Sequence, residues 1–585
     1  MQDLEYGIIG NCATAALVHS DSSIDWLCFP RFDSPSVFAR ILDEEKGGHF
    51  KITPSGRFES SQEYVKDSNV IVTHFSSADW AFDLYDYFPH YESHGRLYKD
   101  PELHRLIKVT RGKPGVTAIV KPMLQYATAE PEVSMEDGCI RFSDSSARES
   151  IYLYSNLPLE KIKTGEELVL DKDSYMVITY NKIKPETGID EIKLMMDKTV
   201  NYWKGWISKA QLPKQNRNLI ARSALVLRLL TYDETGAIIA AATTSIPEIV
   251  GDVRNWDYRY CWIRDSSFTV MSLISISKFD VAHEFMKWAL SIHRKYGINL
   301  QVLFGVNGER DIPERTLDNL SGYKGSRPVR IGNAAATQRQ VDIFGELLDA
   351  IYLFYIKHKK DFNLDESDWE LIYGLVESAI KEWRYKDHSI WEFRTLSRHY
   401  TFSKVLCWVA LDRGAEIAKA LGKEKYAKRW MRIRDEIKND VMAKGWNEGI
   451  SSFTQSYGSD ELDASLLLLP YFGFIDYKDE KMVKTVEAIG KSLFRNGFVM
   501  RYNANDDFGM PKNALIACTF WYIDALYEIG SQAEAIKLFE ETIKHTNSLG
   551  LLSEDINRET GELLGNFPQA YSHIALINTA MHLFK

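Results

Sequence analysis

The sequence has 585 residues, of which 45% are hydrophobic and 26% charged, so its composition is that of a folded protein long enough for more than one domain. The net charge is −10 at pH 7 and the chain has no Lys/Arg cluster or basic stripe, which argues against nucleic acid and anionic membranes as partners. The start lacks a basic segment followed by an apolar one, and no run of about 18 apolar residues occurs, so we expect neither a signal peptide nor a membrane span.

The cysteines are scattered along the chain without a CxxC pair. This spacing favours free, buried thiols over disulfides or a zinc site. We therefore expect a reducing compartment, the cytoplasm, and no bound metal or other cofactor. The six residues are Cys12, Cys28, Cys139, Cys261, Cys407 and Cys518.

Short runs rich in β-branched and aromatic residues follow one another up to about residue 180, separated by Gly, Pro, Asp or Ser turns. Examples are ATAALVH, SIDWLCF, VIVTHF, WAFDLYDYF, SIYLYS and SYMVITY. About ten or more such strands without helices between them predict a large antiparallel β-sandwich, which we place at residues 1–189. Residues 190–210 then read as a helix followed by the breaker QLPKQN, and we place a helical linker at residues 190–212.

From about residue 215 the hydrophobic period becomes helical and remains so. The links after even-numbered segments are mostly short, whereas those before them are mostly long. This is a helical hairpin repeated six times, and stacked hairpins can close into an (α/α)6 barrel at residues 213–585 with all the long loops on one rim. The twelve predicted helices lie near 215–231, 264–278, 280–296, 334–358, 366–385, 403–421, 424–443, 460–472, 480–494, 514–530, 532–547 and 569–583.

The long loops carry aromatic, Arg, Asp and Glu residues, with few hydroxyl nucleophiles and no metal-ligand spacing. No phosphate-binding loop and no GxGxxG after a strand occurs. Aromatic faces and polar side chains suit a neutral polyol, and two carboxylates across a cavity suit cleavage of a glycosidic bond. Taken singly, Asp265, Asp460 and Asp463 are explained equally well as negative charges at helix N-termini.

Glu392 is one such carboxylate, and it stands between Trp391 and Phe393 in SIWEFR. If these neighbours are buried around it, desolvation raises the pKa of the carboxyl group and keeps it protonated for use as an acid. A surface glutamate in a loop whose neighbours point inward is the plainer alternative.

The ordered motifs resemble those of glycoside hydrolase family 15, the family of glucoamylases, trehalases and isomaltose hydrolases. The resemblance covers nearly the whole chain and includes GNCATAALVHSDSSIDWLCFPRFDSPSVFA, NWDYRYCWIRD, GYKGSRPVRIGNAAATQRQVD, SIWEFR, SYGSDELDASLLLLP, RYNANDDFG and GLLSEDI. It implies an N-terminal super-sandwich, a linker helix and an (α/α)6 barrel, in agreement with the pattern of elements.

The resemblance also implies roles for individual residues. Glu392 matches the family's general acid and Glu554, in LLSEDI, its general base. Trp262, Arg264 and Asp265 match residues that hold the terminal glucose. Tyr258 matches a tyrosine near the attacking water, Arg501 matches a sugar-contacting arginine, and Trp391 beside the acid is expected to contact the sugar.

The chain departs from the family at two places. Fungal glucoamylases have a second glutamate after the general acid, where this chain has Phe393. Many bacterial relatives have an acidic residue near the start of the tenth helix, where this chain has Lys512 and Asn513. Both departures affect which leaving sugar the site prefers.

The expected partner is therefore a small α-linked glucoside or oligosaccharide, cleaved with inversion from its non-reducing end. The α-1,4, α-1,6 and α,α-1,1 linkages stay open, and so does a homo-oligomer. The alternatives are a disaccharide phosphorylase of similar architecture, which needs an anion site in place of the base, and a catalytically silent sugar-binding protein. We expect Cys261 to serve packing only.

Overall fold

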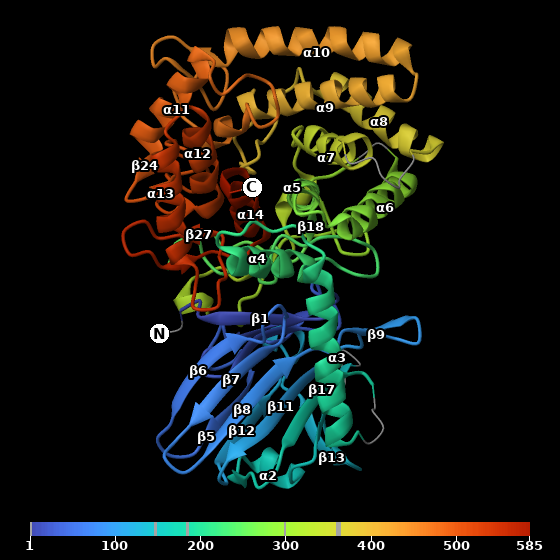
Figure 1. Cartoon of the computed structure of the whole chain (residues 1–585), viewed down its shortest axis with the longest axis vertical. Helices are drawn as coiled ribbons and strands as arrows, with labels where there is room; N and C mark the ends of the chain where they lie inside the picture. The colour runs from blue at the N-terminus through green and yellow to red at the C-terminus, as the bar shows by residue number, and fades with distance from the viewer. Residues whose placement is uncertain (1–2, 145–148, 183–186, 298–299, 358–363, 585) are drawn as a thin grey trace.

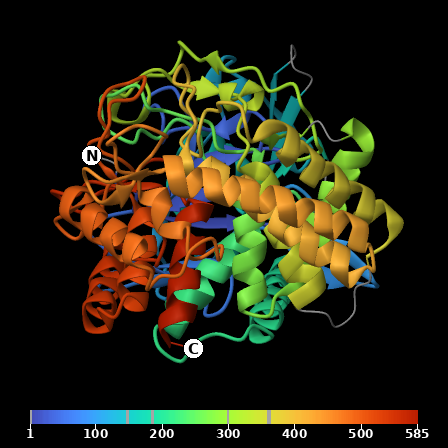
Figure 2. The same cartoon turned by 90° about the horizontal axis from the view of Figure 1, so that it is seen from above.

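The computed structural model describes residues 3–144, 149–182, 187–297, 300–357 and 364–584. It has a ring of helices above a two-layered β-sandwich (Figure 1). Figure 2 shows loops from several barrel segments gathered along one edge of the ring, the upper edge in that view. None of the helices in these ranges is both long and apolar enough to cross a bilayer.

The sandwich consists of two antiparallel sheets, as the strand pattern predicts. The first contains β1 (Tyr6–Gly10), β2 (Ala15–His19), β3 (Ile24–Cys28), β4 (Ser36–Phe38), β5 (His49–Pro54), β12 (Gly115–Lys121) and β16 (Leu168–Val169). The second runs in the order β13 (Glu132–Glu136), β14 (Cys139–Asp144), β15 (Glu149–Ser155), β17 (Ser174–Tyr180), β11 (Glu102–Arg111), β8 (Ala81–Tyr87), β7 (Ile71–Ser76) and β6 (Glu59–Tyr64). A hairpin of β9 (Tyr91–Ser93) and β10 (Arg96–Tyr98) and the short helices α1 (Leu124–Ala127) and α2 (Leu159–Thr164) complete this part.

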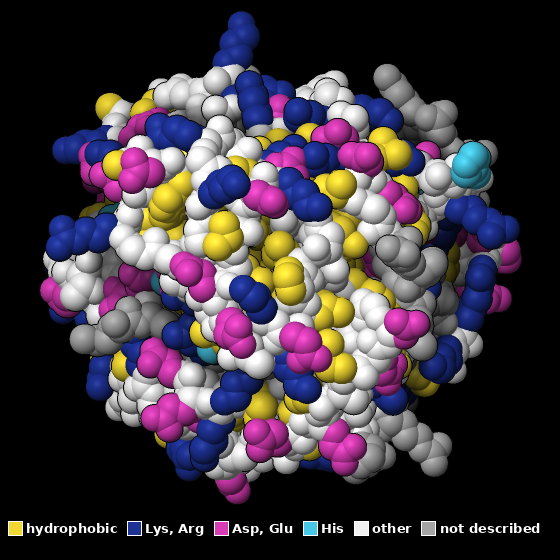
Figure 3. Space-filling view, turned by 90° about the horizontal axis from the view of Figure 1, so that it is seen from below, with side chains coloured by type: hydrophobic (Ala, Val, Ile, Leu, Met, Phe, Trp, Pro, Cys, Tyr) yellow, Lys and Arg dark blue, Asp and Glu magenta, His cyan; other side chains and the backbone are white. Residues whose placement is uncertain are grey.

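The first strands of the sandwich are buried on both faces. Along β1, Tyr6 and Ile8 belong to one apolar cluster with the barrel helices, whereas Ile9 belongs to the cluster between the two sheets. Successive side chains of a strand point to opposite faces, so one sheet serves both cores. The free end of the sandwich carries basic and acidic side chains interspersed with hydrophobic ones (Figure 3).

The barrel has an inner ring of helices that are buried almost all round and an outer ring buried on one face, which is the pattern expected of enclosed and surface helices. The inner ring contains α5 (Ile263–Ser275), α7 (Ile343–Tyr352), α9 (Thr401–Ala420), the 3-10 turn η4 (Ala464–Leu468), α12 (Ile516–Glu528) and α14 (Ala570–Phe584). It closes because α14 packs against both α12 and α5.

The outer ring contains α6 (Phe279–Tyr296), α8 (Glu366–Glu382), α10 (Glu424–Lys444), α11 (Glu480–Leu493), α13 (Gln532–Thr542) and α4 (Arg217–Leu229). The linker helix α3 (Ile189–Ser208) packs on β9, β11, β17 and α4. Because α4 shares an apolar cluster with the first sheet, it is buried more completely than the other outer helices. α10 lies on the side of the barrel away from the sandwich (Figures 1 and 2).

Two predicted helices differ from those observed. The stretch 334–358 splits into the 3-10 turn η2 (Ala334–Thr337), a non-helical piece, α7 and the π-helical turn η3 (Leu353–Lys357), with residue 358 outside the described ranges. The stretch 460–472 contains only η4 among the named helices. Asp463 caps its start, since its side chain accepts from the backbone N–H of Ser465, and Pro470 beyond its end has no N–H with which to continue a helix.

Candidate active site

A single open pocket brings the predicted site residues together. It encloses about 940 Å³ with its mouth included. The long loops supply most of its walls, as the hairpin pattern predicts. The predicted residues that line it are Glu392, Glu554, Tyr258, Trp262, Arg264, Asp265, Trp391 and Arg501.

Glu392 is held through one of its two carboxylate oxygens. Its Oε1 accepts from Trp262 Nε1 at 2.7 Å and from Arg264 Nη2 at 3.1 Å. Among the described residues, Oε2 has no hydrogen-bond partner, and one fifth of the side chain is exposed. The apolar neighbours in sequence therefore do not enclose the carboxylate, which faces a guanidinium and an indole N–H instead.

The backbone at Glu392 adopts a left-handed conformation with a φ of +59°. A non-glycine residue there costs about 1–2 kcal/mol, so surrounding contacts have to maintain it. Gln338 Nε2 donates to the Glu392 carbonyl at 3.0 Å, and Asp507 accepts from the backbone N–H groups of Arg394 and Thr395. Two other loops thus clamp the turn on which Glu392 stands.

Glu554 lies just before β27 (Asp555–Ile556), the middle strand of a small sheet with β26 (Ala514–Leu515) and β28 (Leu563–Leu564). Its Oε1 accepts from Tyr258 Oη at 2.8 Å. Burial and the nearby carboxylates of Glu248 and Asp555 raise the pKa of Glu554 well above its usual range, whereas Arg501 and the Tyr258 hydrogen bond act in the opposite direction.

Each of the two glutamates is bonded to one member of an aromatic pair. The rings of Tyr258 and Trp262 meet edge to face with centroids 5.3 Å apart, and the Tyr258 hydroxyl donates to Glu554 while the Trp262 indole N–H donates to Glu392. Tyr258 and Trp262 come from one stretch of chain, which places a donor for Glu392 and a donor for Glu554 side by side.

Arg264 and Asp265 stand in the first turn of α5, which begins directly after Trp262. Arg264 donates to Gln340 Oε1 at 3.0 Å as well as to Glu392, and Asp342 lies 3.5 Å from it. Burial, with Glu392 adding to it and Arg264 opposing it, raises the pKa of Asp265 to about 6. Asp265 lines the pocket and is also a negative charge at a helix N-terminus, and its contact with a sugar stays a prediction.

Trp391 and Arg501 form further parts of the wall. Trp391 Nε1 donates to Asp463 Oδ2 at 2.7 Å, so the loop before η4 supports the ring without lining the pocket itself. Arg501 pairs with Glu248 and lies 3.7 Å from Asp555.

Several wall residues are not predicted from the sequence. Glu248 stands in SIPEIV, which carries no recognisable signal, and Asn513 donates to its carbonyl. Trp256 could have been found, because it belongs to the NWDYRYCWIRD motif. The guanidinium groups of Arg330 and Arg394 each lie 4.6 Å from the centroid of its ring, and Phe508 lies 5.4 Å away. Phe393 also lines the pocket and stacks on Tyr400.

The cysteines are all free and buried. Cys261 contacts Ser266 Oγ at 3.2 Å and is enclosed in the core. Cys12, His90 and Asp233 approach one another where the sandwich meets the barrel. Arg228 already balances Asp233 there at 2.7 Å, and burial raises the pKa of the Cys12 thiol, so this group does not fit a metal ion.

Comparisons with known proteins agree with this architecture. The model of glycosyl hydrolases family 15 matches residues 214–581, and that of the trehalase-like N-terminal domain matches residues 4–157. A trehalase of Mycolicibacterium smegmatis is 36% identical, covering 99% of this chain and 91% of that protein. A trehalase of Thermoplasma volcanium is 35% identical, covering 99% and 93%.

Among solved structures, a bacterial glucoamylase complexed with acarbose aligns over 100% of this chain and 94% of its own, with a TM-score of 0.72 and 12% identity. At that identity the likeness establishes the fold: a super-sandwich joined to an (α/α)6 barrel. The family match over more than half of the chain, together with relatives that are similar along their whole length, shows that this chain is a glycoside hydrolase and belongs to glycosyl hydrolases family 15.

Proposed function

We propose that the protein hydrolyses α,α-trehalose, or a closely similar small α-glucoside, with inversion at the cleaved carbon. The observation that carries the proposal is the arrangement of Glu392 and Glu554, which line one pocket from different loops and each accept a hydrogen bond from one member of the adjacent pair Tyr258 and Trp262. An inverting mechanism requires two carboxyl groups in one pocket, with room between them for a water molecule. The trehalases that are 35–36% identical along the chain support the choice of sugar.

Glu392 is the general acid in this scheme. Its Oε1 is fixed by two N–H donors, so the proton belongs on Oε2, which has no partner among the described residues. That oxygen gives its proton to the glycosidic oxygen as the bond to the leaving sugar breaks. Arg264, whose guanidinium group donates to Oε1, then stabilises the carboxylate that the reaction leaves behind.

Glu554 is the general base. Its carboxylate accepts a proton from the water that attacks the sugar carbon on the face opposite the leaving group. A base with a raised pKa binds that proton more strongly, provided that it is ionised when the sugar arrives. Tyr258, which donates to Glu554, keeps the carboxylate aimed into the pocket.

The remaining predicted residues bind the sugar. Trp262 and Trp391 offer aromatic surface, and Arg264, Asp265 and Arg501 offer charged groups for hydroxyls. Trp256, Phe508 and Phe393 form a further aromatic part of the wall, which we assign to the leaving sugar. An aromatic wall in place of the acidic group of fungal glucoamylases suits a second sugar held by stacking.

A substrate panel tests the proposal. Trehalose, maltose, isomaltose, kojibiose and nigerose are each incubated with the protein, and free glucose is measured with and without inorganic phosphate. We expect trehalose to give the highest kcat/KM and phosphate to leave glucose as the product. Formation of glucose 1-phosphate would indicate a phosphorylase, and binding of trehalose without turnover would indicate a sugar-binding protein.

We also propose the division into domains 1–189, 190–212 and 213–585. It is supported by the last sandwich strand, which ends at Tyr180, and by the first barrel helix, which begins at Arg217. The six unpaired thiols support a reducing compartment such as the cytoplasm.

A further inference from the structure

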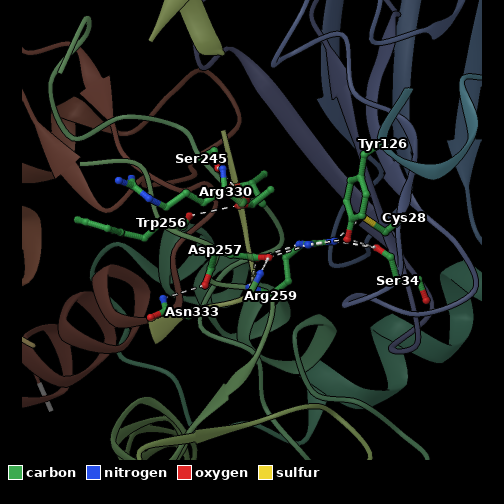
Figure 4. Close-up of polar contacts among 12 residues, drawn as sticks. Cys28, Ser34, Tyr126, Ser245, Trp256, Asp257, Arg259, Arg330 and Asn333 are labelled. Carbon is green, nitrogen blue, oxygen red and sulfur yellow. Dashed lines mark hydrogen bonds and ion pairs between the residues drawn. The ribbon is translucent and has the colours of Figure 1, made fainter. Parts of the chain in front are cut away.

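A buried ion pair flanks Tyr258 in sequence. Asp257 and Arg259 are both fully buried. Arg259 donates from Nε to Asp257 Oδ1 at 2.9 Å and from Nη2 to Asp257 Oδ2 at 2.7 Å (Figure 4). This two-point geometry fixes the guanidinium plane as well as its distance.

Arg259 uses its remaining N–H groups on the N-terminal sandwich. Nη1 donates to the carbonyl oxygen of Ser34 at 2.7 Å and lies 3.4 Å from Cys28 Sγ, and Nη2 donates to Tyr126 Oη at 2.9 Å (Figure 4). The Arg259 side chain therefore extends from the barrel loop and ends among residues of the N-terminal sandwich.

Asp257 connects the loop of Tyr258 to a second barrel loop through hydrogen bonds. Its Oδ2 accepts from the backbone N–H of Gly332 at 3.1 Å, and its carbonyl accepts from Asn333 Nδ2 at 3.3 Å. The pair thus connects three segments: the loop of Tyr258, the loop before η2, and the sandwich.

Tyr258 points the other way. The chain around it is bonded to residues 240–243, since Ala241 N donates to the Tyr258 carbonyl, Ala240 N to the Tyr260 carbonyl, and Tyr258 N to the Thr243 carbonyl. Asp257 and Arg259 bond to each other and to the sandwich and Gly332, whereas Tyr258 between them reaches Glu554 in the pocket.

We propose that Asp257 and Arg259 are positioning residues for the reaction, and that the sandwich, through Ser34 and Tyr126, fixes the phenol of Tyr258 on the carboxylate of Glu554. This inference rests on the proposed role of Glu554 as the general base. It makes the N-terminal domain part of the alignment of the active site, in addition to its contribution to the core.

A displacement of Tyr258 can be measured, because its hydrogen bond is one of the interactions that determine the pKa of Glu554. The carboxylates of Glu248 and Asp555 and burial favour the protonated form, and Arg501 and Tyr258 favour the ionised form. A displaced phenol therefore raises the pKa of Glu554 further. The base has to be ionised to act, so the acid limb of the kcat/KM profile, where activity falls with falling pH, moves to higher pH.

The experiment compares pH profiles on the best substrate of the panel. Tyr258→Phe should move the acid limb upward by about one pH unit, the order expected for losing one hydrogen bond to a charged group. Arg259→Lys should move it in the same direction, and Tyr126→Phe, which removes one hydroxyl only, by a smaller amount. In the double variant Tyr258→Phe/Arg259→Lys, the limb should lie where Tyr258→Phe alone places it.

Arg105→Lys is the matched control. Arg105 and Asp86 form another fully buried pair, within the sandwich, and Arg105 also donates to the carbonyl of Phe50. This variant should lower Tm as Arg259→Lys does and leave the acid limb in place.

The outcomes distinguish the positioning role of Arg259 from the assignment of Glu554 as the base. A lowered Tm with an unmoved limb in both Arg259→Lys and Tyr126→Phe, or an additional shift in the double variant, would overturn the positioning role. An unmoved limb in Tyr258→Phe would instead contradict the assignment of Glu554 as the base that this limb reports, and with it the premise of the inference.

Discussion

The chemistry of Glu392 depends on which oxygen its neighbours occupy. Trp262 and Arg264 both donate to Oε1, which leaves Oε2 for the glycosidic oxygen. Arg264 is in turn held by Gln340 and lies near Asp342, so its position does not depend on the glutamate alone. A positively charged partner on one oxygen also means that the carboxylate formed by proton donation is already matched by charge.

Glu392→Gln tests whether this residue acts as the acid. An amide keeps the shape of the side chain but has no proton to give, so we expect trehalose turnover to fall by about 10²–10⁴-fold. A glucosyl substrate with a very good leaving group, such as α-glucosyl fluoride, needs little protonation and should retain most of its rate. Steady-state kinetics on both substrates gives the answer. An equal loss on the two would mean that Glu392 contributes something other than a proton.

The loops and the short sheets between them, more than the helices, decide the geometry of the site. The small sheet of β26, β27 and β28 fixes the backbone next to Glu554, and Glu554 N donates to the Asn566 carbonyl at 3.1 Å. Helical periodicity predicts most of the barrel helices, because their apolar faces repeat with the helical period. Helical periodicity fails at 338–342, where the chain is not helical and Gln338 and Gln340 contact the Glu392 turn and Arg264, respectively.

Gly565 gives a direct test of how closely this sheet constrains the base. Its φ is +75°, and a Cβ there would lie 2.7 Å from Glu554 Cβ and 2.8 Å from its Oε2. Gly565→Ala should therefore displace the carboxylate and lower kcat by about 10²-fold, the effect of a misplacement of about 1 Å.

Gly497→Ala is the control for Gly565→Ala, since Gly497 has a φ of +87° with nothing within 4 Å of an added Cβ. Both variants should lose about 1–2 kcal/mol of unfolding free energy from the left-handed backbone, measured by denaturant titration. Only Gly565→Ala should lose activity. Equal activities would show that Glu554 tolerates displacement and is not aimed with this precision.

The whole molecule depends on contacts between segments far apart in the chain. Tyr258 and Glu554 are 296 residues apart, Glu248 and Arg501 are 253 apart, and Arg259 is 225 residues from Ser34. Strand and helix periods predict two folded parts and the order of their elements, and the resemblance predicts the pocket residues. Neither predicts Glu248, nor the route from the sandwich to Tyr258, since pairings across such distances leave no local period.

The anomeric form of the first product tests the central claim most directly. In trehalose both anomeric carbons have the α configuration, and the leaving glucose keeps its own. If Glu554 activates water for inversion, the other glucose is released as the β anomer, and the two anomers appear in equal amounts. Proton spectra recorded within minutes of mixing, before mutarotation, should show this ratio. Formation of α-glucose alone would mean two successive inversions, and would contradict both the inverting mechanism and the assignment of Glu554 as its base.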